Sequence, residues 1–348
     1  MNLQRLTSEP LLTVDDITWD FKLKRSIMFP SVIDMEGRLE TPIDRYYMYL
    51  ASHGGREIGL ATAPELEGPW TVQETPILHL DACPAATGHL SSPDIVYDSD
   101  THRFILYYHG NCPDDVLAEQ NRRMPTHDYH RIQNSGAATS IDGVHFDVHP
   151  NPLLLPITTP DHWRVATNMY LRVVKTRSGF HGFFMTMSRD EADYNGVTRS
   201  LPKRERSSRP HPTSIAHAWS ADGLDWVVDE DRAVLTAEAS FGEFHRIRHI
   251  GVTQIGDSHV LATYSCFANP EETQENIFSA TLLLDGKAAH LVEKHGAVLT
   301  PELAWEAGNL RDPYPLVKRG RLYVFYAGGG EKGIGLAATE DGGWGVNG

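Results

Sequence analysis

The stretch Tyr314–Thr339, YPLVKRGRLYVFYAGGGEKGIGLAAT, contains three strand-like segments separated by tight turns. Apolar residues come first, an aromatic segment follows the turn Lys318-Arg319-Gly320, and a segment of small residues follows a glycine-rich turn. Short apolar and aromatic segments bounded by Gly and charged residues are typical of antiparallel strands. The stretch therefore predicts at least three consecutive β-strands.

The same order of segments recurs along the chain, about every 60 to 80 residues. The aromatic copies are Arg45–Ser52, Arg103–Gly110, Phe180–Arg189, Ser258–Cys266 and Arg321–Gly328. A fourth apolar segment closes each unit except the last, and its fifth copy lies near the N-terminus as Glu9-Pro10-Leu11-Leu12-Thr13. Repetition of this kind predicts a β-propeller, with a β-sandwich of irregular strands as the alternative.

We therefore expect an all-β protein that forms a single five-bladed β-propeller over residues 1–348, with the last blade closed by an N-terminal strand. An open sheet would expose an unpaired edge, and the displaced N-terminal segment would cover it. The predicted blades span about residues 27–79, 89–155, 168–236, 245–300 and 309–340, and strand 10–14 completes the last blade.

Composition limits the classes of partner. The chain has 348 residues, with 31 Lys+Arg, 46 Asp+Glu and a formal net charge of −15. This acidic balance argues against nucleic acid and against an anionic membrane surface as partners. No apolar run is long enough to span a membrane, and the three Cys form no C-x-x-C pair. We expect a reduced, cytoplasmic protein, with a signal segment already cleaved from this sequence as the alternative.

One face of the predicted propeller collects polar residues. The starts of the first strands and the ends of the second strands share a face, and the long connections Asn111–Ser135 and Ser188–Ser214 lie on it. Long loops usually carry function, so we expect the active site there. The predicted substrate-binding residues at these positions are His53, His89, Ser92, His109, Arg172, Arg248, His249 and Arg311.

Carboxylates at the same positions are the catalytic candidates. Asp94 and Asp312 lead because each stands where a first strand begins near the axis, and Glu331 lies in the turn Gly330–Gly333. Glycoside hydrolysis needs one carboxylate and one protonated acid, and Glu243 and Glu306 are reserve candidates for the acid. We expect Arg311 to hold Asp312 ionised, since an adjacent cation lowers the pKa of a carboxyl group. The alternative for each aspartate is a loop cap.

The histidines offer a metal site as a further alternative. His53, His89, His109 and His249 are predicted near the axis, but no H-x-H or H-E-x-x-H pattern occurs among them. We therefore expect contacts with substrate hydroxyl groups, and no cofactor.

Several of these residues resemble a known superfamily. The run Ser92-Pro93-Asp94, the run Arg311-Asp312-Pro313 and the repeated blade pattern resemble the five-bladed furanosidases, namely glycoside hydrolase family 43 with relatives in families 32, 68 and 130. The best resemblance is to an uncharacterised group similar to family 43. It implies a glycosidase or transglycosidase with carboxylates in an axial pocket, in which Asp312 stabilises the transition state and Asp94 is an inner-strand aspartate.

The resemblance is incomplete in two places. The first blade has Phe29-Pro30-Ser31 where family 43 has its base aspartate, and the glutamate acid has no clear match.

The function we expect is a glycoside hydrolase-like enzyme that acts on a small glycoside or oligosaccharide in an axial pocket by carboxylate acid/base chemistry. The alternatives are a non-catalytic carbohydrate-binding propeller and a metal-dependent hydrolase that uses the axial histidines.

Overall fold

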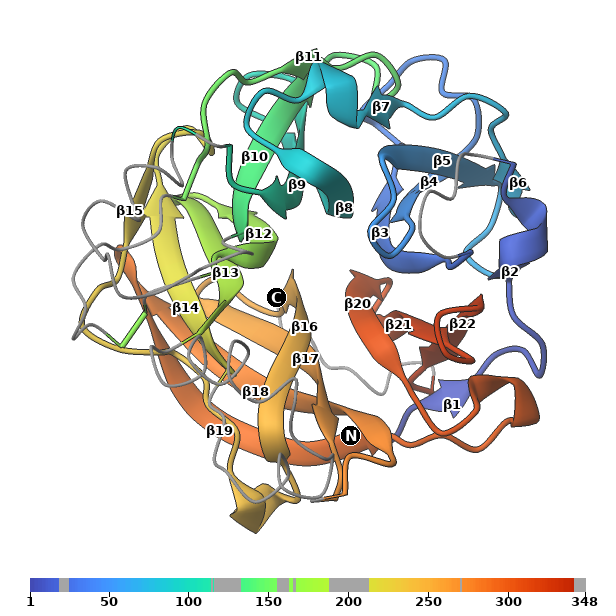
Figure 1. Cartoon of the computed structure of the whole chain (residues 1–348), viewed down its shortest axis with the longest axis vertical. Helices are drawn as coiled ribbons and strands as arrows, with labels where there is room; N and C mark the ends of the chain where they lie inside the picture. The colour runs from blue at the N-terminus through green and yellow to red at the C-terminus, as the bar shows by residue number, and fades with distance from the viewer. Residues whose placement is uncertain are drawn as a thin grey trace.

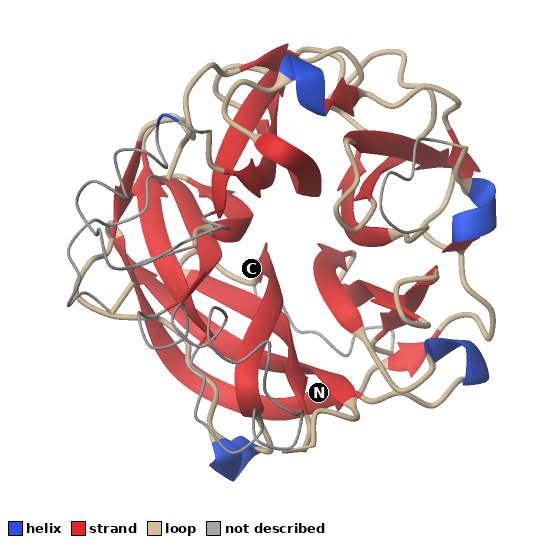
Figure 2. Ribbon diagram, viewed as in Figure 1, coloured by secondary structure: helices blue, strands red, loops and turns tan. Residues whose placement is uncertain are grey.

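A computed structural model describes residues 1–18, 25–113, 115, 133–154, 163–164, 167–187, 213–269 and 271–340. Both long predicted connections, Asn111–Ser135 and Ser188–Ser214, fall largely outside these residues. The described chain is dominated by β-strands, so the all-β prediction is confirmed. In Figure 2 the short 3-10 turns η1 (Val14–Asp16), η2 (Leu80–Ala82), η4 (Ala239–Phe241) and η5 (Ala304–Glu306) lie at the outer edge. No described helix is long and apolar enough to cross a membrane.

The strands follow one another in units, numbered 1 to 5 along the chain. Unit 1 holds β3 (Met28–Asp34), β4 (Tyr46–Ala51), β5 (Glu57–Ala63), β6 (Thr71–Val72) and β7 (Leu78–His79). Unit 2 holds β8 (Thr87–Asp98), β9 (Arg103–Asn111), β10 (Gln133–Ser140) and β11 (Asp147–Val148). Unit 3 holds β12 (Met169–Thr176), β13 (Gly179–Met187), β14 (Thr213–Ser220) and β15 (Trp226–Val228).

The last two units complete the chain. Unit 4 holds β16 (Phe244–Gln254), β17 (His259–Phe267), β18 (Glu275–Asp285) and β19 (Ala288–Leu299). Unit 5 holds β20 (Arg311–Lys318), β21 (Arg321–Gly328) and β22 (Gly333–Ala338), and β22 also pairs with β1 (Gln4–Arg5) and β2 (Leu12–Thr13). Figure 1 shows the units arranged around a common centre, with the first strands β3, β8, β12, β16 and β20 nearest to it.

Hydrogen bonding groups these strands into four sheets among the described residues. Units 3 and 4 share one sheet because Thr213 of β14 pairs with Arg246 of β16 through a single parallel bridge. The remaining ladders between the named strands are antiparallel, as the aromatic repeats predict for strands joined by short turns. The five aromatic segments become the second strands, β4, β9, β13, β17 and β21.

Each first strand contains the same β-bulge. In unit 5 the register passes from Arg311↔Ala327 to Tyr314↔Phe325, so three steps on β20 match two on β21. The same shift occurs in the other four units. In every unit the register shift begins after one pair, such as Arg311↔Ala327 in unit 5, and the next residue on the first strand has a positive φ. These residues are Phe29 (59°), Ser92 (52°), Tyr170 (59°), His249 (43°) and Asp312 (51°). A bulge of this kind bends a strand and re-aims a side chain.

Tyrosine hydroxyls connect two neighbouring pairs of units. The Tyr49 hydroxyl of unit 1 donates to the Gly143 carbonyl of unit 2 at 2.7 Å, and Tyr107 of unit 2 donates to the Gly223 carbonyl of unit 3 at 3.0 Å. Both glycines have φ above 70°, and a β-carbon on Gly223 would lie 2.8 Å from the Tyr107 hydroxyl. Glycine in these two turns therefore allows each turn to bend and to approach the tyrosine of the preceding unit.

A buried ion pair joins the N-terminal strand to unit 5. Arg5 donates from Nε to Glu306 Oε1 at 2.7 Å and from Nη2 to Oε2 at 2.8 Å. Glu306 is fully buried, and it also accepts hydrogen bonds from the Tyr326 hydroxyl and two backbone N–H groups. This pair holds residues that are 301 positions apart in sequence.

Replacing Arg5 by Met should therefore destabilise the fold. The change leaves the buried Glu306 carboxylate without its cation, and removing one partner of a buried ion pair typically costs about 3–5 kcal/mol. We expect the lower end of this range, because three other donors remain on Glu306. Urea unfolding measures the difference. Arg56→Met is the matched control, because its partner Asp81 is 73% exposed and such a pair contributes about 0–1 kcal/mol. Equal effects of the two substitutions would contradict this role of Arg5.

Candidate active site

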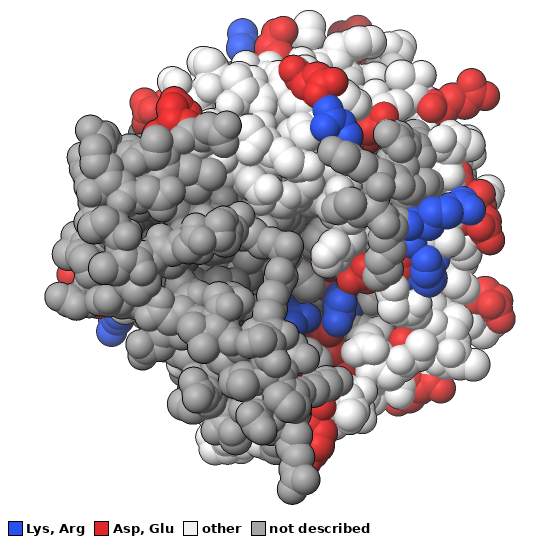
Figure 3. Space-filling model, in the orientation of Figure 1, with Lys and Arg blue, Asp and Glu red and all other residues white. Residues whose placement is uncertain are grey.

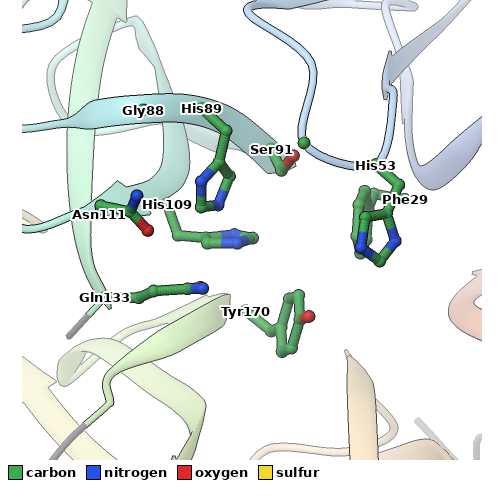
Figure 4. A pocket seen from close by; sticks show the side chains of 10 residues that line it. Phe29, His53, Gly88, His89, Ser91, His109, Asn111, Gln133 and Tyr170 are labelled. Carbon is green, nitrogen blue, oxygen red and sulfur yellow. The ribbon is translucent and has the colours of Figure 1, made fainter. Parts of the chain in front are cut away.

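A cavity of roughly 270 Å³ opens where first strands begin and second strands end. Figure 4 shows the His89 and His109 rings on one side, His53 and Phe29 on another, and Tyr170 between them. The full described lining is Phe29, His53, Gly54, Gly88, His89, Ser91, His109, Asn111, Gln133 and Tyr170. The cavity thus contains three of the predicted substrate-binding histidines, and no carboxylate belongs to its described lining.

The bulge residues pack together beside this cavity. The rings of Phe29 and Tyr170 stack with centroids 5.6 Å apart, and His249 meets Tyr170 edge-on at 4.5 Å. His109, from the second strand of unit 2, meets Tyr170 at 4.9 Å. Tyr170 therefore stands between the cavity and the residues of units 4 and 5.

Asp312 lies behind these rings, fully buried. Nδ1 of His249 lies 3.0 Å from Asp312 Oδ1, but neither carboxyl oxygen of Asp312 has a hydrogen-bond partner among the described residues. Burial, together with the negative charge of Glu331, raises the pKa of Asp312 well above its ordinary value. Arg311 lowers this pKa, as expected, but it does not outweigh the effect of burial.

Arg311 has a limited effect on the pKa of Asp312 because its side chain binds two other carboxylates. Arg311 Nε donates to Glu275 Oε2 at 2.5 Å, and Nη1 donates to Glu331 Oε1 at 2.8 Å. Although burial acts in the opposite direction, Glu275 and Glu331 raise the pKa of Arg311. His53 Nδ1 lies 3.3 Å from the same Glu331 oxygen, so a line of polar contacts runs from Glu275 to the edge of the cavity. Neighbouring carboxyls with different partners are a common source of separate acid and base roles.

Asp94 has a different environment from Asp312. Its carboxylate accepts hydrogen bonds from the backbone N–H of Val173 at 2.8 Å and from Arg172 Nη1 at 3.1 Å, and Ser31 contacts it at 3.4 Å. Burial, opposed by Arg172, raises the pKa of Asp94. Because these partners come from units 1 and 3, Asp94 and Arg172 connect three units.

The bulge explains why Asp94 and Asp312 differ. Counting from the shared register shift, Ser92 is the equivalent of Asp312, whereas Asp94 stands two residues further along. The sequence predicts both aspartates where a first strand begins, and this holds for Asp312, the second residue of β20, but not for Asp94, the eighth of the 12 residues of β8. The Ser92 hydroxyl is buried and has no hydrogen-bond partner among the described residues.

Both reserve acids are held by structural partners. Glu243 accepts hydrogen bonds from the Tyr264 hydroxyl at 2.5 Å, Lys294 Nζ at 2.6 Å and the Glu238 backbone N–H. Glu306 has the corresponding set of tyrosine, cation and backbone donors. Each glutamate thus connects the approach to a first strand with the second strand of the same unit, and neither lines the cavity.

The four predicted axial histidines do not form a recognisable metal site. No group of three His, Cys, Asp or Glu side chains among the described residues is arranged to hold a metal ion. Burial and the nearby His89 and His53 hold the pKa of His109 well below its ordinary value, and the His109 Nδ1 atom has no described hydrogen-bond partner. A neutral imidazole of this kind can exchange hydrogen bonds with an uncharged hydroxyl group.

Seven lining residues were not among the predicted site residues. They are Phe29, Gly54, Gly88, Ser91, Asn111, Gln133 and Tyr170. The Pro30, Pro93 and Pro313 residues that follow three of the bulge positions are the one signal that could have found Phe29. On the face in Figure 3, basic and acidic side chains meet near the middle, and the visible described surface has no extended basic patch.

The raised pKa of Asp312 predicts how the free energy of unfolding varies with pH. The unfolded pKa of Asp is about 3.9, so the stabilisation from neutral Asp312 is fully present below about pH 4 and is lost as pH rises through the higher folded pKa. Asp312→Asn keeps a neutral group at every pH. The unfolding free energy of Asp312→Asn, minus that of the unaltered protein, should therefore increase from pH 4 to pH 8.

Chemical denaturation at each pH measures this difference. Asp100→Asn is the control, because Asp100 is 74% exposed and lies in the turn between β8 and β9. The unfolding free energy of Asp100→Asn, minus that of the unaltered protein, should vary little from pH 4 to pH 8. A flat difference for Asp312→Asn would show that Asp312 is ionised in the fold.

Comparison with known proteins identifies relatives of this architecture. No protein-family model matches the chain. An uncharacterised protein, R118, of Acanthamoeba polyphaga mimivirus is 24% identical over 369 residues, which covers 95% of this chain and 88% of that protein.

Three solved structures have a similar fold. A thermostable family-43 glycoside hydrolase has a TM-score of 0.60 at 14% identity, covering 91% of both chains. A family-43 β-xylosidase/α-arabinofuranosidase from a compost metagenome, in complex with xylotriose, has a TM-score of 0.56 at 15% identity, covering 97% of this chain and 94% of the other. An N-acetylgalactosamine deacetylase from F. plautii, in complex with blood group B trisaccharide, has a TM-score of 0.61 at 13% identity, covering 97% and 95%. The chain thus shares the propeller-like fold of family-43 glycoside hydrolases and of a sugar deacetylase.

Proposed function

We propose that the protein is a glycoside hydrolase-like enzyme that acts on a small glycoside bound in the cavity lined by His53, His89 and His109. The observation that carries the proposal is Asp312, a fully buried carboxyl group with no described hydrogen-bond partner, held at a strained position next to His249. Buried, unpaired and strained groups are concentrated at functional sites. The fold shared with carbohydrate-active proteins supports the same reading.

The two carboxyl groups suit different steps of glycoside hydrolysis. Asp312, whose pKa is raised by burial, would donate a proton to the leaving oxygen, and Glu331, bound to Arg311, would act as the carboxylate that activates water or attacks the sugar. His53 lies 3.3 Å from Glu331, and Tyr170 lies beside the His249 ring, so both carboxyls adjoin residues of the cavity lining. Uncharged hydroxyl groups of the sugar would meet the imidazoles and the amides of Asn111 and Gln133.

A second candidate is the hydrolysis of an acyl group from an amino sugar. It is favoured by the described lining of the cavity, which has three imidazoles and no carboxylate, and by the deacetylase among the similar structures. Release of acetate from N-acetylated sugars would identify this activity, whereas release of an aglycone or a reducing sugar identifies a glycosidase. Sugar binding without either product is the outcome expected of a carbohydrate-binding propeller.

We further propose that the five units form one closed five-bladed propeller. The support is the recurrence of the same bulge in five first strands and the pairing of Gln4 with Ala338 and of Leu12 with Ile334. In this arrangement the N-terminal strands cover the outer edge of unit 5.

Removing residues 1–14 should then expose that edge. We expect a lower melting temperature and concentration-dependent aggregation, because β22 would present unpaired backbone groups. Differential scanning calorimetry and light scattering measure the two effects. Removing residues 1 and 2, which precede β1, is the control. A monomeric protein with an unchanged melting temperature after removal of residues 1–14 would contradict closure.

Substitution of the two carboxyls tests the enzymatic proposal. On an aryl glycoside that the unaltered protein hydrolyses, Asp312→Asn and Glu331→Gln should each reduce kcat/KM about 100- to 1,000-fold, a typical effect of removing one catalytic or charge-stabilising group. Asp100→Asn is the matched control, since the same chemical change at an exposed turn should leave the rate unaltered. Melting curves verify folding. Near-normal turnover by Asp312→Asn would remove Asp312 from the mechanism.

A further inference from the structure

A second cavity lies at the other end of the five first strands, which are nearest the centre in Figure 1. The candidate active site adjoins residues at which these strands begin, such as Phe29 of β3 and Tyr170 of β12. The second cavity, of roughly 580 Å³, is lined by residues near the ends of the same five strands, and we call it the distal cavity. Small-molecule sites in proteins usually have about 300–1,000 Å³, so its size suits a small organic ligand.

Apolar side chains form part of the distal cavity. Each of the five first strands contributes at least one aliphatic residue to its lining, and these residues include Val32 of β3, Val96 of β8, Val174 of β12, Val252 of β16 and Leu316 of β20. Tyr97 and Tyr314 also belong to the lining and, like Leu316, are partly exposed. The distal cavity can therefore hold the apolar part of a ligand.

Four basic and two acidic residues belong to the same described lining, namely Arg38, Lys175, Lys318, Arg319, Asp34 and Glu36. Both carboxylates already have cations. Lys318 binds Asp34 and lies 3.7 Å from Glu36, and Arg45, outside the lining, contacts the same two carboxylates. Lys175 is paired as well, since its Nζ atom lies 2.8 Å from Asp100 Oδ2. Arg38 and Arg319 are the lining cations that remain.

Arg38 lines the distal cavity without an ion pair, because no carboxylate of the described residues lies within ion-pair distance of its guanidinium group. Its Nη1 atom donates to the backbone carbonyl of Asp34, and the guanidinium lies over the Tyr97 ring, 5.6 Å from the centroid. Burial, opposed only in part by the hydroxyl groups of Tyr314 and Tyr97, lowers the pKa of Arg38. Arg38 is thus a partly buried cation, and one of its five N–H donors has a partner among the described residues.

Arg319 adds a second positive charge at the rim of the distal cavity. It stands in the turn between β20 and β21, is exposed, and forms no hydrogen bond or ion pair with a described residue. Its charge acts on Lys318, whose pKa is lowered by burial and by Arg319. Two lining cations without a carboxylate partner attract an anion into the cavity between them.

We propose that the distal cavity binds an organic carboxylate, whose charged group pairs with Arg38 and whose apolar part lies against Tyr314 and Leu316. A planar guanidinium holds a carboxylate through two parallel hydrogen bonds, and stacking on Tyr97 reduces the freedom that Arg38 loses on binding. Arg319 contributes a weaker attraction, since it is exposed to solvent and screened by salt. This site is independent of the proposed function, because the two cavities share no residue of their described linings.

Binding of simple acids and their uncharged amides tests the proposal. The full chain is titrated calorimetrically, at fixed ionic strength, with hexanoate, hexanamide, benzoate, benzamide, acetate and inorganic phosphate. We expect hexanoate or benzoate to bind about tenfold or more tightly than its own amide, because a hydrogen bond to a charged group has this effect or more. Acetate and phosphate should bind at least about tenfold more weakly than the better of the two larger acids, since they lack its apolar part.

Four variants identify the residues responsible. Arg38→Gln should remove the preference for the carboxylate over the amide, and Arg38→Lys should restore part of it, since Lys keeps the charge but not the paired donors. Arg319→Gln alters an exposed residue and should weaken carboxylate binding by a smaller factor than Arg38→Gln. Arg103→Gln is the matched control, because Arg103 is exposed at the start of β9 and lies outside the lining. Melting curves verify that the variants fold.

The outcomes decide the proposal in either direction. A preference for one of the larger carboxylates that Arg38→Gln removes and Arg103→Gln keeps supports it, and the better of hexanoate and benzoate shows whether an aliphatic or an aromatic acid fits. Equal affinities of each carboxylate and its amide, or no binding of either carboxylate, would overturn it. Acetate or phosphate binding as tightly as the larger acids, or unchanged carboxylate affinity in both Arg38→Gln and Arg319→Gln, would overturn it as well.

Discussion

The left-handed residue in the bulge of each first strand is the constraint on which the rest of the structure depends. A residue other than glycine at positive φ costs on the order of 1–3 kcal/mol, and five such residues recur at equivalent positions. Regular ladder pairing on both sides of each bulge holds the strained residue in place. In return, the bulge brings Phe29, Tyr170 and His249 into mutual contact, although they lie 220 positions apart in sequence at the extremes.

The same constraint separates two kinds of buried carboxyl group. Asp312 occupies the bulge position, is fully buried and has no hydrogen-bond partner within the described part of the chain, and burial raises its pKa. Asp94 follows the bulge by two residues, where a backbone N–H and a guanidinium from the next unit reach it. Position relative to the bulge, rather than the presence of an aspartate near the axis, therefore decides which carboxyl group is available for chemistry.

The strands and their order could be predicted because the aromatic segments repeat with little change. The repeat also places His53, His89 and His109 correctly on one face, since each lies at the start of a first strand or the end of a second. The individual roles could not be predicted. A bulge adds one residue, and only a proline after the bulge position in three units marks it, so a comparison of the aspartates alone hides the difference between Asp94 and Asp312. The direction of Arg311 depends on Glu275, a third-strand residue that no motif distinguishes. Glu243 and Glu306 have the composition of catalytic acids, yet tyrosine and a distant cation bind both.

The pairing of β1 and β2 with β22 has a consequence for how the chain folds during synthesis. The ribosome releases Gln4 more than 300 residues before Ala338, its partner in the sheet. Throughout that interval the first segment lacks β22, the strand with which it pairs. Contacts between such distant residues form slowly and leave strand edges open to other chains. Neighbouring nascent chains on the same messenger RNA can therefore exchange N-terminal segments. A chaperone bound near the N-terminus would protect the unpaired segment against such exchange until the last unit is translated.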